Sequence, residues 1–268
     1  LVVGWGLMIP VFGILQTRLL PGPHHWAVRA IHLLVGLAAM AMAARLVRFI
    51  RSNHARGTGR YFVPAAGRHW RLPFYDLMAS LLGADAARRM LVQQAATRPG
   101  ERVLDVGAGT GALALEIKRG QPLAEVTGVD PDPRALELAR RKGKRARLSI
   151  RFDQGFADSL PYPAGSFDRV TSSFVLHHLA PGEKTAALGE LRRVLRPGGR
   201  LHLLDFDGPR GGDAGLLARR IHASAPLRDN DADRILGYLT SAGFEQPKVV
   251  GRHLSRVAGS VLLYEASA

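Results

Sequence analysis

The segment 103–111 constrains the fold of this chain more than any other stretch. It reads Val-Leu-Asp-Val-Gly-Ala-Gly-Thr-Gly, so an apolar run that contains Asp105 leads into glycines at positions 107, 109 and 111. Residues 103–106 have the character of a short buried parallel strand, and residues 112–119 carry apolar side chains at helical spacing. Glycine permits tight turning and close approach of a ligand to the backbone. The pattern therefore predicts a strand-to-helix turn that binds a nucleotide-type cofactor.

The spacing of the glycines narrows the class of cofactor. It is G-x-G-x-G, whereas the dinucleotide-binding fingerprint is G-x-G-x-x-G, so the pattern argues against NAD and FAD. A second apolar run over 125–130 ends at Asp130, 19 positions after Gly111. A carboxylate at the end of such a strand can accept hydrogen bonds from both hydroxyls of an adenosine ribose.

Five motifs follow one another in an order that is typical of one enzyme family. They are Asp105 with its three glycines, Asp130, Gly155-Phe-Ala-Asp-Ser-Leu-Pro161, Ser166-Phe-Asp168 leading into Val170-Thr-Ser-Ser-Phe-Val175, and Leu195-Arg-Pro-Gly-Gly199. Over roughly residues 61–268 the chain resembles the class I S-adenosylmethionine-dependent methyltransferases, and most of all the branch with the ubiquinone and menaquinone C-methyltransferases. The resemblance implies S-adenosyl-L-methionine as the cofactor and methyl transfer as the reaction.

Strands and helices alternate through the rest of the chain, which predicts an α/β fold with a doubly wound, mostly parallel, seven-stranded sheet. Beyond 103–106 and 125–130, we expect strands over 148–152, 167–172, 200–205, 246–253 and 255–265. Further helices are expected over 136–145, 185–195 and 232–242, the last one capped by Gly243. The two closing strands in succession resemble the antiparallel end of the methyltransferase sheet.

The N-terminal part of the chain has a different composition. The first 60 residues contain seven arginines, no acidic residue, and two apolar stretches over 1–15 and 31–44. Neither stretch alone reaches the ~20 residues that span a bilayer, but both do so when their flanks are included. With the breaker Pro21-Gly-Pro-His-His25 between them, we expect two transmembrane helices over 1–51 that form a hairpin. A buried helical hairpin packed on the domain is the alternative, and a cleaved signal peptide is a poorer one.

The arginines predict the orientation of this hairpin. Five of them follow the second stretch, at positions 45, 48, 51, 56 and 60, whereas Arg18 and Arg29 lie near the turn. By the positive-inside rule the chain would be held in the cytoplasmic membrane with the catalytic domain facing the cytoplasm. A basic linker is expected over 52–67, and the methyltransferase domain over 68–268.

The resemblance also implies which residues bind the cofactor. The backbone of Gly107, Ala108 and Gly109 would pass under the methionine part, with Asp105 orienting the loop or receiving the ammonium group through water, and Asp130 would bind the ribose. The full predicted set is Asp105, Gly107, Ala108, Gly109, Gly111, Asp130, Pro131, Phe156, Ala157 and Ser172. Many relatives have Gly-Asp-Ala where this chain has Gly155-Phe-Ala157, so the side-chain acceptor for the adenine amino group is missing here. Asp153 or Asp158 could replace it.

The catalytic residues are less defined. Methyl transfer depends mainly on positioning, because the cofactor already carries an activated methyl group. Carbon methylation of a phenol-like ring would need a base, and His177 and His178, just past the fourth expected strand, have a suitable pKa range for one. A structural role at a helix start is the alternative for both. Tyr75 and Asp76, on an amphipathic segment over 74–82, are candidate lid residues, and Tyr75 is a third catalytic candidate; an ordinary packing helix is the alternative for this segment. No metal site is expected.

The predicted function is that of a membrane-anchored methyltransferase whose acceptor is a hydrophobic small molecule, such as a quinone precursor or a lipid. A methyltransferase of a soluble metabolite and a non-catalytic cofactor-binding scaffold are the alternatives. The net charge of +15 includes seven charges before residue 61 and a basic run over 140–151. Such a run can contact anionic lipid at ~1 kcal/mol per residue, in addition to the hairpin. Nucleic acid is a less favoured partner, because no added RNA-binding module is present.

Overall fold

The structure is a computed structural model that describes residues 76, 79–80, 83–208, 230–255 and 259–268. All of them fall within the second of the two units into which the chain divides, Phe62–Ala268. The expected hairpin over 1–51, the linker over 52–67 and Tyr75 lie outside the described residues, and the domain boundaries stay a prediction. Within the described ranges, no helix combines the length and the apolar character needed to cross a bilayer.

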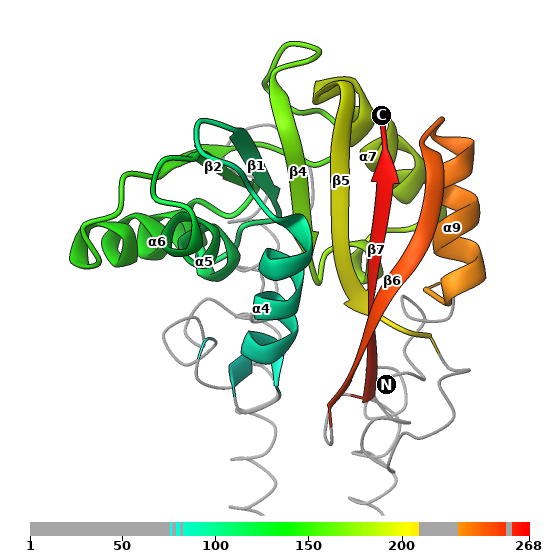
Figure 1. The fold of residues 1–268 in the computed structure, drawn as a ribbon, viewed down its shortest axis with the longest axis horizontal. Helices are drawn as coiled ribbons and strands as arrows, with labels where there is room; N and C mark the ends of the chain where they lie inside the picture. Colours follow the sequence, from blue (N-terminus) through cyan, green and yellow to red (C-terminus); the bar gives the residue numbers. More distant parts are fainter. Residues whose placement is uncertain (1–75, 77–78, 81–82, 209–229, 256–258) are drawn as a thin grey trace, which may run out of the picture. The chain divides into compact units, whose positions relative to one another are not determined.

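Seven strands form one sheet, in the spatial order β3-β2-β1-β4-β5-β7-β6 (Figure 1). Strands β1 to β5 run parallel, and β7 is antiparallel to both of its neighbours. The predicted seven-stranded, mostly parallel α/β fold is therefore confirmed. The strands are β1 (Arg102–Val106), β2 (Glu125–Asp130), β3 (Arg151–Gln154), β4 (Phe167–Ser173), β5 (Leu195–Phe206), β6 (Glu245–Ser255) and β7 (Gly259–Ser267).

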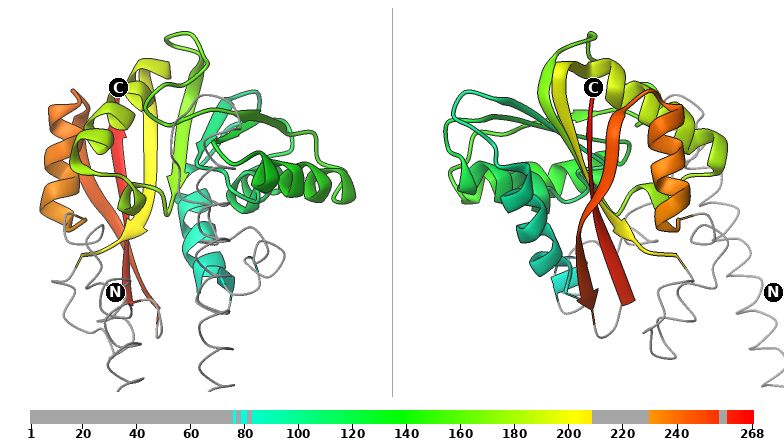
Figure 2. Two further views of the ribbon diagram at one scale, coloured as in Figure 1. Left: turned by 180° about the vertical axis from the view of Figure 1, so that it is seen from behind. Right: turned by 45° about the vertical axis from the view of Figure 1, so that its right-hand side comes forward.

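Helices cover both faces of this sheet (Figures 1 and 2). One face carries α4 (Ala84–Ala95), α5 (Ala112–Gly120) and α6 (Pro133–Arg145), and the other carries α7 (Pro181–Val194) and α9 (Ala232–Ser241), while the short 3₁₀ helix η2 (Leu176–His178) follows β4. Each face has its own apolar core: Leu91, Ile117 and Leu136 belong to the first, and Leu188 and Ile235 to the second.

Local sequence explains where several helices begin. Asp132 is the N-cap of α6, where its side chain accepts from the Arg134 amide, and Pro133 at the first position is pre-organised for a helix. Asp231 caps α9 in the same way through the Arg234 amide. Helix α5 begins instead at Gly111, whose φ of 79° is a left-handed conformation that favours glycine.

Three of the differences between the structure and the predicted elements concern a helix and the strands β3 and β5. Helix α4 was not expected. The third strand covers 151–154 rather than 148–152, because the Leu148 amide donates to the Gly143 carbonyl and so remains attached to the end of α6. The fifth strand begins at Leu195, where the sequence predicts the end of a helix, because Leu195 pairs with Phe167 of β4.

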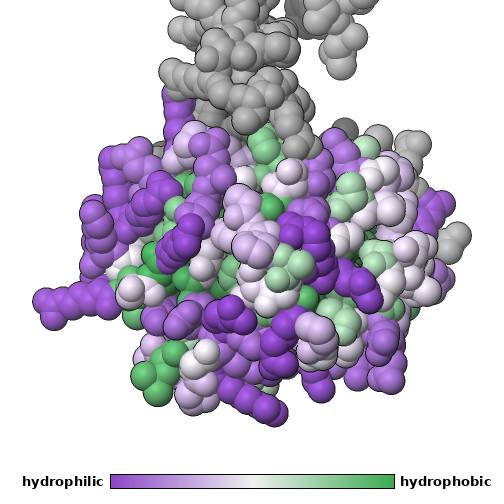
Figure 3. Space-filling view, turned by 90° about the horizontal axis from the view of Figure 1, so that it is seen from above, coloured by the Kyte–Doolittle hydropathy of each residue, from purple (hydrophilic) through white to green (hydrophobic). Residues whose placement is uncertain are grey.

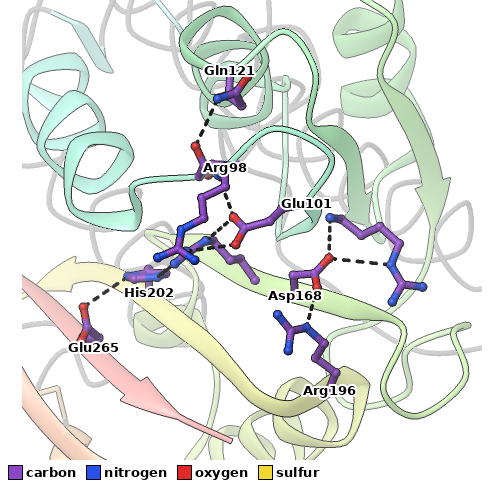
Figure 4. A network of polar contacts seen from close by, with 10 residues as sticks. Arg98, Glu101, Gln121, Asp168, Arg196, His202 and Glu265 are labelled. Carbon is purple, nitrogen blue, oxygen red and sulfur yellow. Dashed lines mark hydrogen bonds and ion pairs between the residues drawn. The ribbon is translucent and has the colours of Figure 1, made fainter.

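A polar network joins the strands at the end of the sheet where β1 and β4 begin (Figure 4). Arg169 of β4 donates to both carboxylate oxygens of Glu101, at 2.6 and 3.2 Å, and its guanidinium lies 3.3 Å from the ring of His202. Nearby, Asp168 accepts from the Arg102 amide and from Arg196. The surface seen from above Figure 1 is mainly hydrophilic, with apolar side chains in small separate areas (Figure 3).

Candidate active site at the carboxyl ends of the strands

The glycine loop lies where three parallel strands end. Val106, the last residue of β1, pairs with Val129 of β2 and with Ser172 of β4. The amides of Gly107 and Ala108 both donate to the Val129 carbonyl, at 2.8 and 3.0 Å. A Cβ atom on Gly107 would lie 2.2 Å from a methyl group of Val175, so no larger residue fits there. The segment after β4 therefore packs directly on the glycine loop.

Asp130 connects the end of β2 to this loop. One carboxylate oxygen accepts from the Gly109 amide and the other from the Asp132 amide, both at 2.8 Å. Burial raises the pKa of Asp130 to about 6, and these two hydrogen bonds partly oppose that shift. The predicted ribose-binding residue is thus also the residue that holds the glycine loop in place.

Asp105 is buried in β1 with an unused oxygen. Its carboxyl group is 1% exposed, one oxygen lies 3.4 Å from the Thr171 hydroxyl, and the other makes no hydrogen bond to any residue that the structure describes. Burial raises the pKa of Asp105 to about 7, and the positive charge of Arg88 acts in the opposite direction. A buried acceptor without a donor is costly in an empty site and suits a site that receives a cation.

Asp76, one of the two predicted lid residues, is in contact with the loop. Its carboxylate accepts from the Thr110 hydroxyl at 2.5 Å and from the Lys142 ammonium at 2.7 Å. Asp76 therefore joins the segment before α4 to both the glycine loop and α6. Burial lowers the pKa of Lys142, while the ion pair with Asp76 raises it.

The predicted adenine side of the site lies after β3. The Gly155 amide donates to the Asp130 carbonyl at 3.2 Å, which places Phe156 and Ala157 next to the ribose-binding position. Both residues are half-buried. Asp153, one of the two suggested replacements for the missing acceptor, already accepts from the Tyr162 hydroxyl at 3.0 Å and pairs with Arg151.

Two further predicted residues have local structural roles. The Ser172 hydroxyl is buried and donates to the Val106 carbonyl at 2.9 Å, so it joins β4 to β1. The Pro131 carbonyl accepts from the Gln154 side chain at 3.1 Å. In the structure, the Ser172 hydroxyl and the Pro131 carbonyl thus both form hydrogen bonds within the protein.

His177 forms a pair with Asp205 at the end of β5. Its Nδ1 lies 2.7 Å from an Asp205 oxygen, and its amide donates to the same carboxylate at 3.2 Å. Burial alone would raise the pKa of Asp205, but the charge and hydrogen bond of the His177 ring, together with the Phe206 amide, outweigh it and hold that pKa below its usual range. Because an ionised carboxylate can only accept, Nδ1 carries the proton and the lone pair of a neutral His177 is on Nε2. His178 is exposed beside it, with the two ring centroids 3.9 Å apart.

Sequence reasoning missed Asp205 and Arg88. Asp205 ends an expected strand, as Asp130 does, so its place at the carboxyl edge of the sheet was a usable signal. Arg88 gave no such signal, because it lies on the unexpected helix α4. Within the described part of the chain, no three His, Asp or Glu side chains are grouped to hold a metal ion.

Known proteins resemble this chain in sequence. The family model for the methyltransferase domain matches residues 103–199. The demethylmenaquinone methyltransferase of Thermus thermophilus is 47% identical over 150 residues, which cover 55% of this chain and 67% of that protein. The chain belongs to the S-adenosylmethionine-dependent methyltransferases. A ubiquinone/menaquinone biosynthesis C-methyltransferase of a Geobacter species is 38% identical to this methyltransferase over 143 residues, 51% of this chain and 60% of that protein.

The match thus spans about two thirds or less of the length of these relatives. Among solved structures, a methyltransferase of Thermotoga maritima superposes with a TM-score of 0.56 at 21% identity, over 74% of this chain and 97% of that one, and this likeness concerns the fold.

The site of the methyltransferase fits its cofactor, S-adenosyl-L-methionine. The unpaired oxygen of Asp105 is an acceptor for an ammonium group. Asp130 is placed at the end of β2, where a ribose is bound in related nucleotide folds.

Proposed function

We propose that this methyltransferase methylates a hydrophobic small molecule of the quinone-precursor type, and that its N-terminal segment holds it in the cytoplasmic membrane with the catalytic domain on the cytoplasmic side. The observation that carries the proposal is the pairing of His177 with Asp205 next to the glycine loop, in a chain 47% identical over 150 residues to a demethylmenaquinone methyltransferase. The two arginine-flanked apolar stretches before residue 52 support the membrane location.

Different residues of the site would bind different parts of the cofactor. Gly107 and Ala108 offer backbone that a ligand can approach closely, Asp130 offers carboxylate oxygens to the ribose, and Asp105 offers one to the ammonium group. When bound, the cofactor supplies a methyl group on a positively charged sulfur, which needs no covalent help from the protein. Positioning of the acceptor then accounts for much of the rate.

His177 is the proposed base for the acceptor. Its Nε2 lone pair can accept the proton of a phenolic hydroxyl, and the resulting phenolate makes the neighbouring ring carbon nucleophilic. Asp205 is buried and ionised, so it fixes the tautomer of His177 and stabilises the imidazolium that forms. The close packing of Val175 on Gly107 keeps this histidine, two residues further on, near the cofactor loop.

The first test is transfer of labelled methyl from S-adenosylmethionine in membranes that carry the full chain, with and without added demethylmenaquinol, followed by solvent partition. We expect label in the organic phase, increased by the quinol and absent with Asp130→Ala. Label in the aqueous phase alone would contradict a hydrophobic acceptor, and no label in either phase would contradict the proposed activity.

The role of His177 is tested by His177→Asn, with the neighbouring His178→Asn as the matched control. We expect methyl transfer to fall about 10²- to 10⁴-fold in the first variant, the range for loss of a general base, and much less in the second. Affinity for S-adenosylhomocysteine should stay unchanged in both. Equal rates for the two variants would refute the assignment.

The membrane location is tested by deleting residues 1–52. We expect the full chain to remain with the membrane fraction in high salt and the truncated chain to be released, because salt screens surface charge but not apolar insertion. A truncated chain that stays with the membrane in high salt would show that this segment is not the anchor.

A further inference from the structure

Arg88 is a buried cation that the reaction proposed above does not use. It belongs to α4 and is 5% exposed. Its Nη1 donates to an Asp85 carboxylate oxygen at 3.2 Å, while Nε has no hydrogen-bond acceptor among the residues that the structure describes. A buried guanidinium normally has its donors paired, because an unpaired one loses hydration without compensation. The free donor of Arg88 therefore points to a ligand.

The surroundings of Arg88 place it beside the cofactor loop. Its guanidinium carbon lies 5.8 Å from the centre of the Phe174 ring. Phe174 has a positive φ of 59°, and its amide donates a hydrogen bond to the Leu204 carbonyl at 2.8 Å. It directly precedes Val175, which packs on Gly107. Arg88 is thus anchored against the segment that contacts the methionine end of the site.

Arg88 and Asp105 are complementary but not paired. The charge of Arg88 acts on the Asp105 carboxyl group, yet the ion pair of Arg88 is with Asp85. Each of the two buried groups keeps one unused hydrogen-bonding atom, a donor on Arg88 and an acceptor on Asp105. An α-amino acid zwitterion presents the matching set, a carboxylate and an ammonium group on one carbon.

We propose that Arg88 binds the α-carboxylate of the methionine moiety of S-adenosylmethionine, while Asp105 receives its ammonium group. The inference rests on the cofactor assignment and adds a specificity-determining residue to it. Arg88 would then select nucleosides that carry an intact amino-acid group. A purely structural arginine, bound to Asp85 and stacked on Phe174, would show no such selection.

The test compares two ligands that differ only in the carboxylate: S-adenosylhomocysteine and its decarboxylated analogue. Isothermal titration of the full chain should show the wild type binding the first about 10- to 100-fold more tightly, as expected for a charge-assisted contact with a buried partner. In Arg88→Met, affinity for S-adenosylhomocysteine should fall by the same factor, whereas affinity for the analogue should change less than about twofold.

Two further variants make the outcome specific. Arg89→Met removes the exposed neighbouring arginine and should alter neither affinity. Arg88→Lys keeps the positive charge but lacks the planar guanidinium group, so it should retain part of the preference for the carboxylate. This variant keeps the test informative if Arg88→Met does not fold.

The inference is overturned if Arg88→Met weakens both ligands equally, if it weakens neither, or if Arg88→Lys abolishes binding of both. If the wild type binds neither ligand, the cofactor assignment itself is refuted. The titration of the wild type alone shows this, before any variant is compared.

Discussion

The proposed binding role of Asp105 would come at a cost to stability. Its carboxyl group is buried, and one oxygen has no donor among the described residues. Burial raises its pKa from 3.8 to about 7, so without a ligand the folded chain favours the neutral form. Removing the ionisable group should therefore stabilise the unliganded protein and weaken the liganded one, as is common at functional sites.

Asp105→Asn tests this at the residue scale. A raised carboxyl pKa means that stability is highest below the unfolded value and falls as pH rises toward about 7, with the full loss above it. The asparagine variant lacks this loss, so at pH 8 it should be more stable than the wild type by up to about 4 kcal/mol. Urea unfolding at pH 5 and pH 8 measures it. A variant less stable than the wild type at pH 8 would contradict the argument.

The same residue explains what sequence could and could not predict about the site. Asp105, Asp130 and the glycines belong to local patterns in which strand, turn and acid are adjacent along the chain, so they were identifiable directly. Arg88 and Asp205 reach the same region through tertiary packing. Asp205 becomes meaningful only when β5 is placed next to β4, where it meets His177.

At the scale of elements, Phe152 of β3 packs against β2 and against the glycine loop. A Cβ atom on Gly128 of β2 would lie 2.7 Å from the Phe152 ring and 2.9 Å from Ala108, and one on Gly111 would lie 3.0 Å from the same ring. Phe152 itself is 6% exposed. The close approach of an aromatic side chain therefore requires glycine at position 128, whereas at Gly111 the nearest atom is the Cβ of Ala139, at 2.8 Å, and the positive φ also favours glycine.

Gly128→Ala tests this packing. Overpacking of this kind typically costs about 1–3 kcal/mol, and we expect thermal unfolding to show a loss in that range. Adding Phe152→Leu should recover part of it, because the ring is the nearer obstacle. Gly111→Ala should recover less with the same second change, since its φ of 79° strains any residue with a Cβ. Equal recovery at both positions would be evidence against the steric explanation.

Elements with strong periodicity were predictable, and those shaped by their neighbours were not. The strand over 125–130 has the bounds of β2, and the helix over 232–242 differs from α9 by one residue. Helix α4 was missed because its N-cap, Gly83, has no side chain that could cap the helix. The antiparallel end was expected in outline, but the insertion of β7 between β5 and β6 is set by pairing rather than by local pattern.

At the scale of the whole molecule, titratable groups of opposite behaviour lie at the two ends of the sheet. Asp105 and Asp130, at or near the carboxyl ends of the parallel strands, have raised pKa values, so they add stability as pH falls. His202 lies in the polar network at the other end, fully buried between Arg169 and Glu265 (Figure 4). Burial, reinforced by Arg169, lowers its pKa from 6.5 to about 4, so it removes stability as pH falls.

The two acids and the histidine therefore act in opposite directions between pH 8 and pH 5, where ordinary carboxylates stay ionised. A variant that lacks one of the two contributions should show the pH dependence that the other produces. His202→Gln leaves the acids, so stability should rise as pH is lowered from 7 to 5. Asp105→Asn leaves His202 and Asp130, which act in opposite directions. His202 alone lowers stability by about 2 kcal/mol over the same interval and Asp130 offsets part of this loss, so stability should fall only slightly.

Denaturant unfolding of the full chain at pH 5, 6, 7 and 8, without cofactor, measures both slopes. The double variant provides the control, because its slope should return toward that of the wild type if the two ends of the sheet act independently. Parallel pH profiles for the two single variants would mean that neither buried group governs the response. Opposite slopes would show that the raised pKa values of the buried acids are offset, between pH 5 and pH 8, by a histidine at the far end of the same sheet.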